Sequence, residues 1–192
     1  MHRKNTVVCT LALAMFAATA GASSVSDKLQ ALAKDKIQAL VNTPAVVKSV
    51  KAQNARFAAV SQADIDKMDK EWRAETKNSG GEMIDKTLAT PLSAYLKKVK
   101  SDGQGMFTEV FVMDNHGLNV GQSDMTSDYW QGDEAKWQKT FLVGANAVHI
   151  SKVEFDESSQ SYQAQVSVAI ADPQTHAVIG AATFGVNADS LQ

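Results

Sequence analysis

The residues best suited to chemistry lie together between positions 119 and 137. This stretch holds two of the three tryptophans, one tyrosine, four carboxylates and a lysine. Aromatic side chains form walls for a small ligand, and a few fixed polar groups orient it. Carboxylates among aromatic residues suit a cationic or amine-bearing ligand, whereas Lys136 suits a carboxylate. An alternative stays open, in which Trp130 and Trp137 only pin the stretch onto the fold while its aspartates cap turns.

The same stretch gives little support for catalysis or metal binding. Asp128, Asp133 and Glu134 are the residues that a paired-carboxylate hydrolase would use, yet carboxylates this close in sequence more often cap turns or face solvent. Asp124, Thr126 and Asp128 begin like a calcium loop, but the glycine and final glutamate that such a loop needs are out of register. The sequence contains no His-Glu-x-x-His motif, nucleophile elbow or phosphate loop. We therefore expect a protein that is not an enzyme and that uses no metal and no cofactor.

The N-terminus has the pattern of a secretory signal peptide. A short basic segment, residues 1–5, precedes an apolar run from Val7 to Ala18 that is broken only by Thr10. This run is too short to span a bilayer, which takes about 20 apolar residues. Ala20 and Ala22 stand at the positions that signal peptidase reads. We expect cleavage after Ala22 and a periplasmic location, the alternative being an uncleaved N-terminal anchor.

The chain that remains, Ser23–Gln192, has about 170 residues and is expected to form one domain with its own core. It has no cysteine, because Cys9 lies within the signal, so the fold does not depend on a disulfide. Loss of Arg3 and Lys4 leaves 17 basic and 21 acidic residues, a formal net charge of −4. No basic patch stands out, which argues against a nucleic-acid partner. No second hydrophobic segment follows the first, so the mature chain is not expected to insert into a membrane.

Residues 25–101 are predicted to be helical, because apolar residues recur there at helical spacing. The members of this apolar stripe are Leu29, Ala33, Ile37, Leu40, Val41, Val46, Val47, Val50 and Phe57. Pro44 ends or kinks the first helix, Ser61 is the expected N-cap of another, and Pro91 takes the first position of a third. We expect a helical scaffold packed on a sheet. The alternative is a dimerisation arm, which would give a homodimer through the N-terminal helices.

Residues 106–187 are predicted to form mostly strands. The predicted strands are Phe107–Met113, Leu118–Gly121, Val148–Phe155, Tyr162–Ile170 and Ala177–Val186. The fourth alternates strictly between two sets of residues, which is typical of a strand. Five strands in hairpin order, with one long insertion between the second and third, predict an antiparallel α+β domain. In the last strand, Gly180 and Gly185 leave space for close packing or for a ligand.

Several of these segments resemble the extracytoplasmic Cache sensor domains, which are also called PAS-like or PDC sensor domains. Phe111–Val120 is similar to the opening hairpin of that family, in which a strand ends in Asp and turns through Gly. Thr126–Glu134 resembles the segment that follows, and Tyr162–Asp172 with Val178–Gly180 resembles the paired final strands. The resemblance covers roughly residues 85–187.

The resemblance implies a single Cache-like domain over residues 23–192. It would have a five-stranded antiparallel sheet with N-terminal helices packed on it, and a small-molecule pocket between the sheet and the long insertion. Such domains usually bind amino acids, amines or organic acids, and bind them without converting them.

The resemblance also implies where a ligand would be held. Asp128, Tyr129 and Trp130 match the loop that closes the family's pocket, and Gln122–Ser123 matches its mouth. Asp172 matches an acidic position that meets a ligand amine in some members. The ligand-binding residues expected from the aromatic stretch and the resemblance together are Gln122, Ser123, Asp128, Tyr129, Trp130, Trp137 and Asp172.

The chain departs from the family pattern in one respect. Typical members sit between two transmembrane helices and drive a kinase, cyclase or chemotaxis module, whereas this sequence ends at Gln192 without an output domain. The expected function is therefore a non-enzymatic, periplasmic ligand-binding sensor module that works with a separate membrane partner, such as a receptor or a kinase. The alternative is a structural or protein-interaction module with a Cache-like fold and no working pocket.

Overall fold

A computed structural model describes residues 24–156 and 161–191, so the predicted signal peptide and its cleavage site lie outside the described residues. The N-terminal half is helical, as predicted. Its elements are α1 (Val25–Leu32), the π-helical turn η1 (Ala33–Ile37), α2 (Gln38–Val41), α3 (Pro44–Arg56), α4 (Gln62–Lys77), α5 (Glu82–Leu88) and α6 (Pro91–Asp102). Within these described ranges, no helix is both long and apolar enough to cross a membrane.

The helix boundaries follow local capping chemistry. Thr43 caps α3, which has Pro44 in its first turn. Ser61 and Asp64 form a reciprocal capping box at the start of α4, since each side chain bonds the other's backbone N–H. Thr90 accepts a hydrogen bond from the N–H of Ser93 at the start of α6. The predicted helix starts at Ser61 and Pro91 are confirmed within the one-residue ambiguity of a cap, and the predicted break at Pro44 separates α2 from α3.

The C-terminal half forms an antiparallel sheet. Its elements are β1 (Phe107–Met113), β2 (Asn119–Gln122), the short helix α7 (Ala135–Gln138), β3 (Val148–Ile150), β4 (Glu154–Asp156), β5 (Ser161–Ala171), β6 (Val178–Asn187) and the 3₁₀ turn η2 (Ala188–Leu191). The strand order is β2-β1-β6-β5-β3, and β4 also pairs with β5. The predicted α+β class is confirmed.

One predicted strand is wrong in its extent. Residues 148–155 do not form a single strand but contribute to two short ones, β3 and β4, so the sheet has six strands rather than five. The ladder ends after Ile150 because the Ser151 hydroxyl, rather than a backbone carbonyl, accepts the N–H of Gln165 at 2.8 Å. The chain then leaves the sheet edge and returns at Glu154, which pairs with Gln163.

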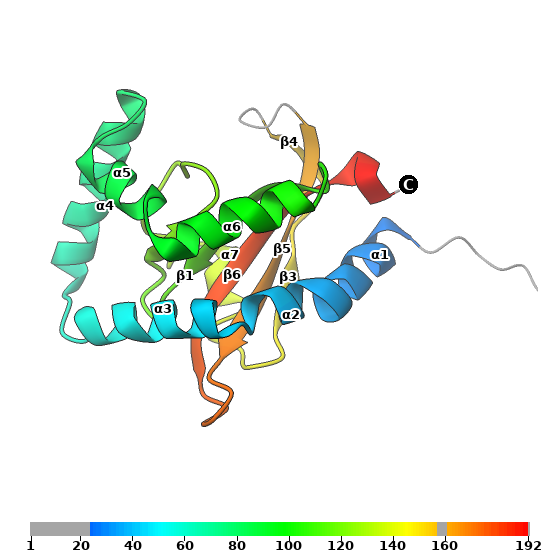
Figure 1. The fold of residues 1–192 in the computed structure, drawn as a ribbon, viewed down its shortest axis with the longest axis horizontal. Coiled ribbons are helices and arrows are strands. Elements are labelled where there is room, and N and C mark those ends of the chain that lie inside the picture. The colour runs from blue at the N-terminus through cyan, green and yellow to red at the C-terminus, as the bar shows by residue number, and fades with distance from the viewer. Residues whose placement is uncertain (1–23, 157–160, 192) are drawn as a thin grey trace, which may run out of the picture.

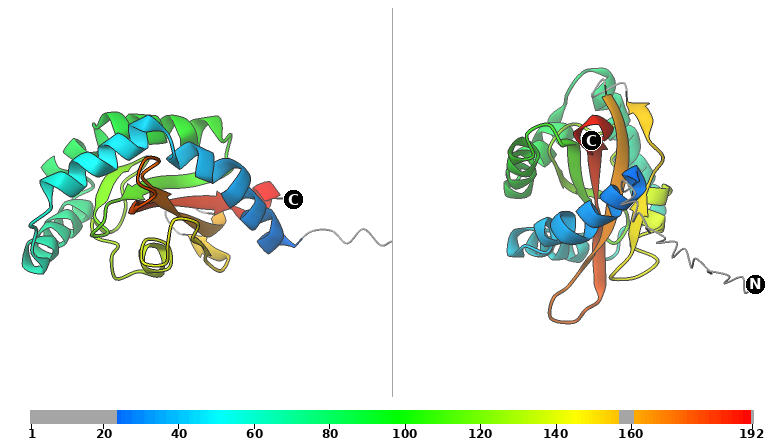
Figure 2. Two further views of the ribbon diagram at one scale, coloured as in Figure 1. Left: turned by 90° about the horizontal axis from the view of Figure 1, so that it is seen from below. Right: turned by 90° about the vertical axis from the view of Figure 1, so that its right-hand side faces the viewer.

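Two different layers cover the two faces of the sheet (Figures 1 and 2). Helices α1–α3 and α6 cover one face, and the α4–α5 pair extends beyond its end. Residues 123–147, which we call the covering segment, lie over the opposite face and contain α7. The sheet is therefore buried on both sides, by regular helices on one and by a mostly irregular segment on the other.

The apolar stripe of the N-terminal helices faces the sheet. Leu29, Ile37, Val46 and Val50 are at most 2% exposed and belong to the main core with the apolar residues of β5 and β6. Burying a side chain of this size contributes on the order of 1.5–3 kcal/mol. The stripe is thus used within this chain's own core, as the scaffold interpretation predicts.

Gly180 in β6 sits where two elements approach each other closely. A Cβ atom added there would lie 2.3 Å from the carbonyl oxygen of Met113 and 3.0 Å from Cγ1 of Val50. We expect Gly180→Ala to lower the free energy of unfolding by about 3 kcal/mol, because a backbone carbonyl in a strand cannot move aside. Urea denaturation measures the loss.

Gly105→Ala is the matched control. A Cβ added at Gly105 has no heavy atom within 4 Å, and only its φ of +89° opposes the change. That backbone strain should cost about 1 kcal/mol. Equal losses of stability in the two variants would contradict the close-packing role of Gly180.

Candidate functional site

The two faces of the sheet differ sharply in polarity. Val110, Val112, Val166 and Phe184 belong to the apolar core on the helix side. Successive strand residues point to opposite faces, so their neighbours face the covering segment. On that face Phe111, Met113 and Ala181 form a small apolar cluster. Beside it lie polar residues that form what we call the polar layer: Glu109, Asn119, Gln122, Gln165, Ser167 and Thr183. A buried polar surface of this size lowers stability unless its groups are satisfied, which makes the layer a candidate site.

The aromatic residues of the covering segment fix it onto the sheet. Trp137 and Phe141 stack with ring centroids 4.8 Å apart and pack against Phe111 and Met113. The indole N–H of Trp137 also donates to the carbonyl oxygen of Asp114 at 3.0 Å. Trp137 therefore anchors the segment at the edge of the polar layer.

A chain of hydrogen bonds connects the covering segment to the polar layer. The backbone carbonyl oxygen of Asp128 accepts from the Thr126 hydroxyl at 2.7 Å, the Gln131 amide at 2.9 Å and the Asn119 amide at 3.0 Å. Gln131 Oε1 in turn accepts from Lys136 Nζ at 3.2 Å. One carbonyl thus joins β2, the loop and the buried lysine in a single network.

Lys136 is the buried cation of the site. Its side chain is only 13% exposed, its Nζ lies 2.9 Å from a carboxylate oxygen of Glu134, and it lies 5.4 Å from the centroid of the Phe111 ring. An ammonium group has three donors. Lys136 therefore presents a charge and its donors beside the polar layer.

Two buried polar atoms of the layer have no hydrogen-bond partner among the described residues. They are Nε2 of Gln122, whose side chain is fully buried, and Oδ1 of Asn119. The Thr126 hydroxyl lies between their side chains, since it accepts from the Asn119 amide at 2.9 Å and approaches Gln122 Oε1 at 3.4 Å. One donor and one acceptor are consequently free inside the layer.

Glu109 is the acid of the layer. Burial raises the pKa of its carboxyl above the ordinary value of 4.5, and the hydrogen bond from the Gln165 amide and the charge of Lys136 oppose that rise. Glu109 also lines a groove of about 490 Å³ together with Phe107, Asp124 and Asn187. The layer thus contains a carboxyl group and, within its electrostatic reach, the Lys136 ammonium.

A carboxylate on α4 holds the covering segment in place. Asp69 Oδ1 accepts the backbone N–H groups of Tyr129 and Trp130, both at 3.0 Å, and Oδ2 accepts from Arg73 Nε at 2.7 Å. Arg73 also forms an ion pair with Asp128 at 2.6 Å. These contacts fix the backbone of residues 128–130, and therefore the carbonyl that organises the network.

The structure brings six of the seven predicted ligand residues into one region but gives several of them other partners. Tyr129 stacks on the buried Trp72, with centroids 5.4 Å apart, and burial raises its pKa to about 12. The Trp130 indole donates to the His116 carbonyl at 2.8 Å, and the Asp128 carboxylate is engaged by Arg73. Ser123 accepts the N–H of Val110.

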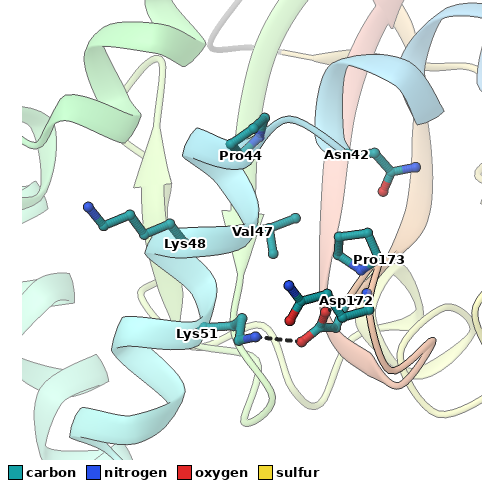
Figure 3. Close-up of a pocket in the computed structure, with 8 residues that line it drawn as sticks. Asn42, Pro44, Val47, Lys48, Lys51, Asp172 and Pro173 are labelled. Atoms are coloured by element: carbon teal, nitrogen blue, oxygen red, sulfur yellow. Dashed lines mark hydrogen bonds and ion pairs between the residues drawn. The ribbon is translucent and has the colours of Figure 1, made fainter.

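Asp172 lies apart from these six, on the helix side of the sheet. It forms an ion pair with Lys51 of α3 and lines a groove there (Figure 3). The covering segment is on the opposite face. Asp172 and the aromatic stretch therefore do not share a site in this structure.

Sequence reasoning missed several residues of the site. Asp69 and Arg73 gave no local signal, because they meet residues about 60 positions away. Gln165 was detectable, since it alternates with apolar residues along β5, whereas Glu109 precedes an apolar run in β1 and gave no such signal. The polar half of that alternation marks the face that the covering segment buries.

Comparison with solved structures finds sensor and ligand-binding domains. The sensor domain of DcuS from E. coli is 15% identical, covers 86% of this chain and 95% of its own, and has a TM-score of 0.48. The ligand-binding domain of chemoreceptor Tlp3 from Campylobacter jejuni, in complex with 4-methylisoleucine, is 13% identical over 88% of this chain, with a TM-score of 0.41. The sensor domain of the histidine kinase DctB from V. cholerae is 14% identical over 84% of this chain, with a TM-score of 0.39.

The chain spans 60% of the Tlp3 chain and 59% of the DctB chain. All three TM-scores are below 0.5, so these similarities carry no fold family, ligand or role over to this chain. No protein-family model and no curated protein matches the sequence.

Asp69 should control the order of the covering segment. We expect Asp69→Ala to lower the free energy of unfolding by about 3 kcal/mol, because it leaves two backbone N–H groups and Arg73 without their acceptor. Amide hydrogen exchange should accelerate at Tyr129 and Trp130 in this variant. The control is Asp66→Ala on the same helix, whose exposed carboxylate accepts only from the Gln62 amide. Unchanged exchange at residues 129 and 130 would contradict the role of Asp69.

Glu109 should make stability depend on pH. The pKa of Glu109 is higher in the folded protein than the ordinary value of 4.5, so ionisation of this carboxyl lowers the free energy of unfolding at a pH above the folded pKa. Below pH 4.5 the carboxyl is protonated in both the folded and the unfolded state, and this loss of stability disappears. We expect Glu109→Gln to raise the melting temperature at about pH 7.5 and to leave it unchanged at about pH 3.5. The exposed Glu154→Gln is the control for calorimetry at both pH values. A gain for Glu109→Gln that is equal at the two pH values would refute the burial argument.

Proposed function

We propose that this protein is a non-enzymatic, periplasmic small-molecule-binding module of the sensor type, with its ligand between the polar layer and the covering segment. One observation carries the proposal: the buried layer contains the Lys136 ammonium and the unpartnered Gln122 Nε2. Buried polar groups without partners cost stability, and a polar metabolite would provide the missing partners.

The charges of the layer suit the proposed class of ligand. Lys136 offers donors to a carboxylate, and Glu109 offers an acceptor to an ammonium group. The Phe111 ring lies beside the Lys136 charge, which provides an apolar surface next to it. Amino acids, amines and organic acids combine such groups, so they are the ligands that we propose.

The acidic residues of the covering segment support a binding role rather than hydrolysis. Asp128 is paired with Arg73 and Glu134 with Lys136. A general acid or a nucleophile of a glycosidase needs a carboxyl group that is free to act on the substrate. Both of these carboxylates instead hold the structure together.

The cellular context follows from the sequence. We propose cleavage after Ala22, a single domain over residues 23–192, and a separate membrane receptor or kinase that responds to the bound state. A homodimer through the N-terminal helices would have to use their exposed polar faces, because their apolar stripe is already buried.

A structural or interaction module without a ligand is the second candidate. It is favoured by the three indoles, which all donate to backbone carbonyls: Trp72 to Thr126, Trp130 to His116 and Trp137 to Asp114. In that case the aromatic residues only pin the covering segment, and the polar layer contributes no binding.

A thermal-shift screen of amino acids, amines and organic acids distinguishes the two candidates. A ligand that binds the folded state raises the melting temperature. For any carboxylate-bearing hit, we expect Lys136→Met to weaken binding at least about tenfold, because a charge-assisted hydrogen bond is lost. Titration calorimetry measures the affinity.

Lys139→Met is the control, since Lys139 lies one turn further on and is exposed. This substitution removes the same charge without changing the polar layer, so the affinity of the variant for the ligand should match that of the wild type. Equal losses of ligand affinity in the two variants would indicate that Lys136 acts through long-range electrostatics and does not contact the ligand. A stable wild-type protein that no compound shifts, and from which mass spectrometry releases no small molecule, would favour the structural candidate.

A further inference from the structure

A second groove lies on the helix side of the sheet, opposite the covering segment (Figure 3). It runs between the break in the N-terminal helices at Asn42–Pro44 and the turn that joins β5 to β6. Its volume is about 390 Å³. Its residues are separate from those of the polar layer.

The walls of this groove are apolar and stiff. Pro44 and Pro173 line it from two different elements, and Val47 of α3 lies between them. Proline rings have few conformations, so these walls lose little entropy when a ligand covers them. An apolar ligand body of a few carbons would therefore find a preformed surface.

One end of the groove is polar and highly ordered. Lys51 Nζ lies 2.5 Å from Asp172 Oδ2, and the other oxygen of Asp172 accepts the N–H of Gln174 at 2.9 Å. The Asp172 side chain is 6% exposed, whereas that of Lys51 is 49% exposed. The hydrogen bond from Lys51 lowers the pKa of Asp172, which keeps the carboxylate ionised and the ammonium in place.

The ammonium of Lys51 retains donors for a ligand. It has three N–H groups, and only the bond to Asp172 occupies it within the described chain. The Asn42 and Gln174 side chains also line the groove, and neither forms a hydrogen bond of its own among the described residues. The spare N–H groups of Lys51, beside these two amide side chains, suit a carboxylate.

We infer that this groove binds a small monocarboxylate with an apolar body, whose carboxylate meets Lys51 while its hydrocarbon lies against Val47, Pro44 and Pro173. The inference is independent of the site proposed under the covering segment. It makes Asp172 the ion-pair partner of the lysine that contacts the ligand, and not itself the contact for a ligand amine.

Benzoate is the probe, with benzyl alcohol and benzylamine as analogues of similar shape. Amide chemical shifts of the isotopically labelled full-length mature protein report both affinity and location. Benzoate should shift the signals of Val47, Lys51 and Gln174, and it should bind at least about tenfold more tightly than either analogue.

Two lysine variants separate contact from general electrostatics. Lys51→Met should weaken the binding of benzoate at least about tenfold. Lys48→Met removes an equal charge from the same helix, but the Lys48 ammonium points away from Lys51 and Asp172 (Figure 3), so affinity should change less than about twofold. Equal weakening in the two variants would overturn the inference.

Asp172→Asn separates ligand contact by Lys51 from simple structural support. The asparagine oxygen can still accept the Gln174 N–H, but it no longer competes with the ligand for the charge of Lys51. Binding of benzoate should therefore persist or tighten, whereas a purely structural ion pair predicts that Asp172→Asn and Lys51→Met weaken it equally. Shifts confined to the covering segment, or no shift in the wild type, would also overturn the inference. Neither outcome bears on the polar layer's own ligand screen.

Discussion

The arrangement of the polar face depends on the carboxylate of Asp69. Its two hydrogen bonds from the Tyr129 and Trp130 N–H groups act together with the β-bridge between Leu118 and Trp130 to hold a loop that is otherwise irregular. They help to keep the Asp128 carbonyl where the Asn119 and Gln131 amides reach it. A nearly buried charge is costly, and it is compensated here by two backbone donors and by Arg73. Because that compensation requires all the partners together, the loop has one favoured position.

Helix α3 connects the two faces of the sheet through a second buried carboxylate. Gln53 donates to Asp114 at 3.0 Å, and Asp114 accepts the N–H groups of His116 and Leu118 in the β1–β2 turn. The carbonyl of the same residue accepts from Trp137 on the other side. Burial raises the pKa of Asp114, which its donors oppose. The turn between β1 and β2 is therefore the point where the helical scaffold and the covering segment meet.

The sequence predicted features whose causes are local. The starts of α3, α4 and α6 follow from Thr43, Ser61 and Thr90, each of which caps its own helix, and the long strand β5 follows from its alternation. The break between β3 and β4 could not be predicted, because it depends on a hydroxyl of one strand meeting the backbone of another. The same limit applies to the site. Whether Asp128 faces a ligand or Arg73 is decided by a helix far away in the sequence. The family resemblance adds Asp172 to the expected ligand residues without showing on which face of the sheet its side chain lies.

The aromatic stretch has two interpretations, as the wall of a ligand pocket or as a set of anchors that hold the loop on the sheet. In the structure the aromatic residues are the anchors, and the polar residues beneath them form the candidate pocket. The indoles and Tyr129 form the fixed contacts, each through burial, a stacked ring or a single N–H donor. Beneath them, one amide atom each of Asn119 and Gln122 has no partner among the described residues, and Lys136 keeps one N–H beyond those that meet Glu134 and Gln131. A loop without its aromatic anchors could not hold such groups away from water, because solvent would satisfy them and the layer would open. The aromatic anchors are therefore necessary for a buried polar site, and their presence does not argue against such a site.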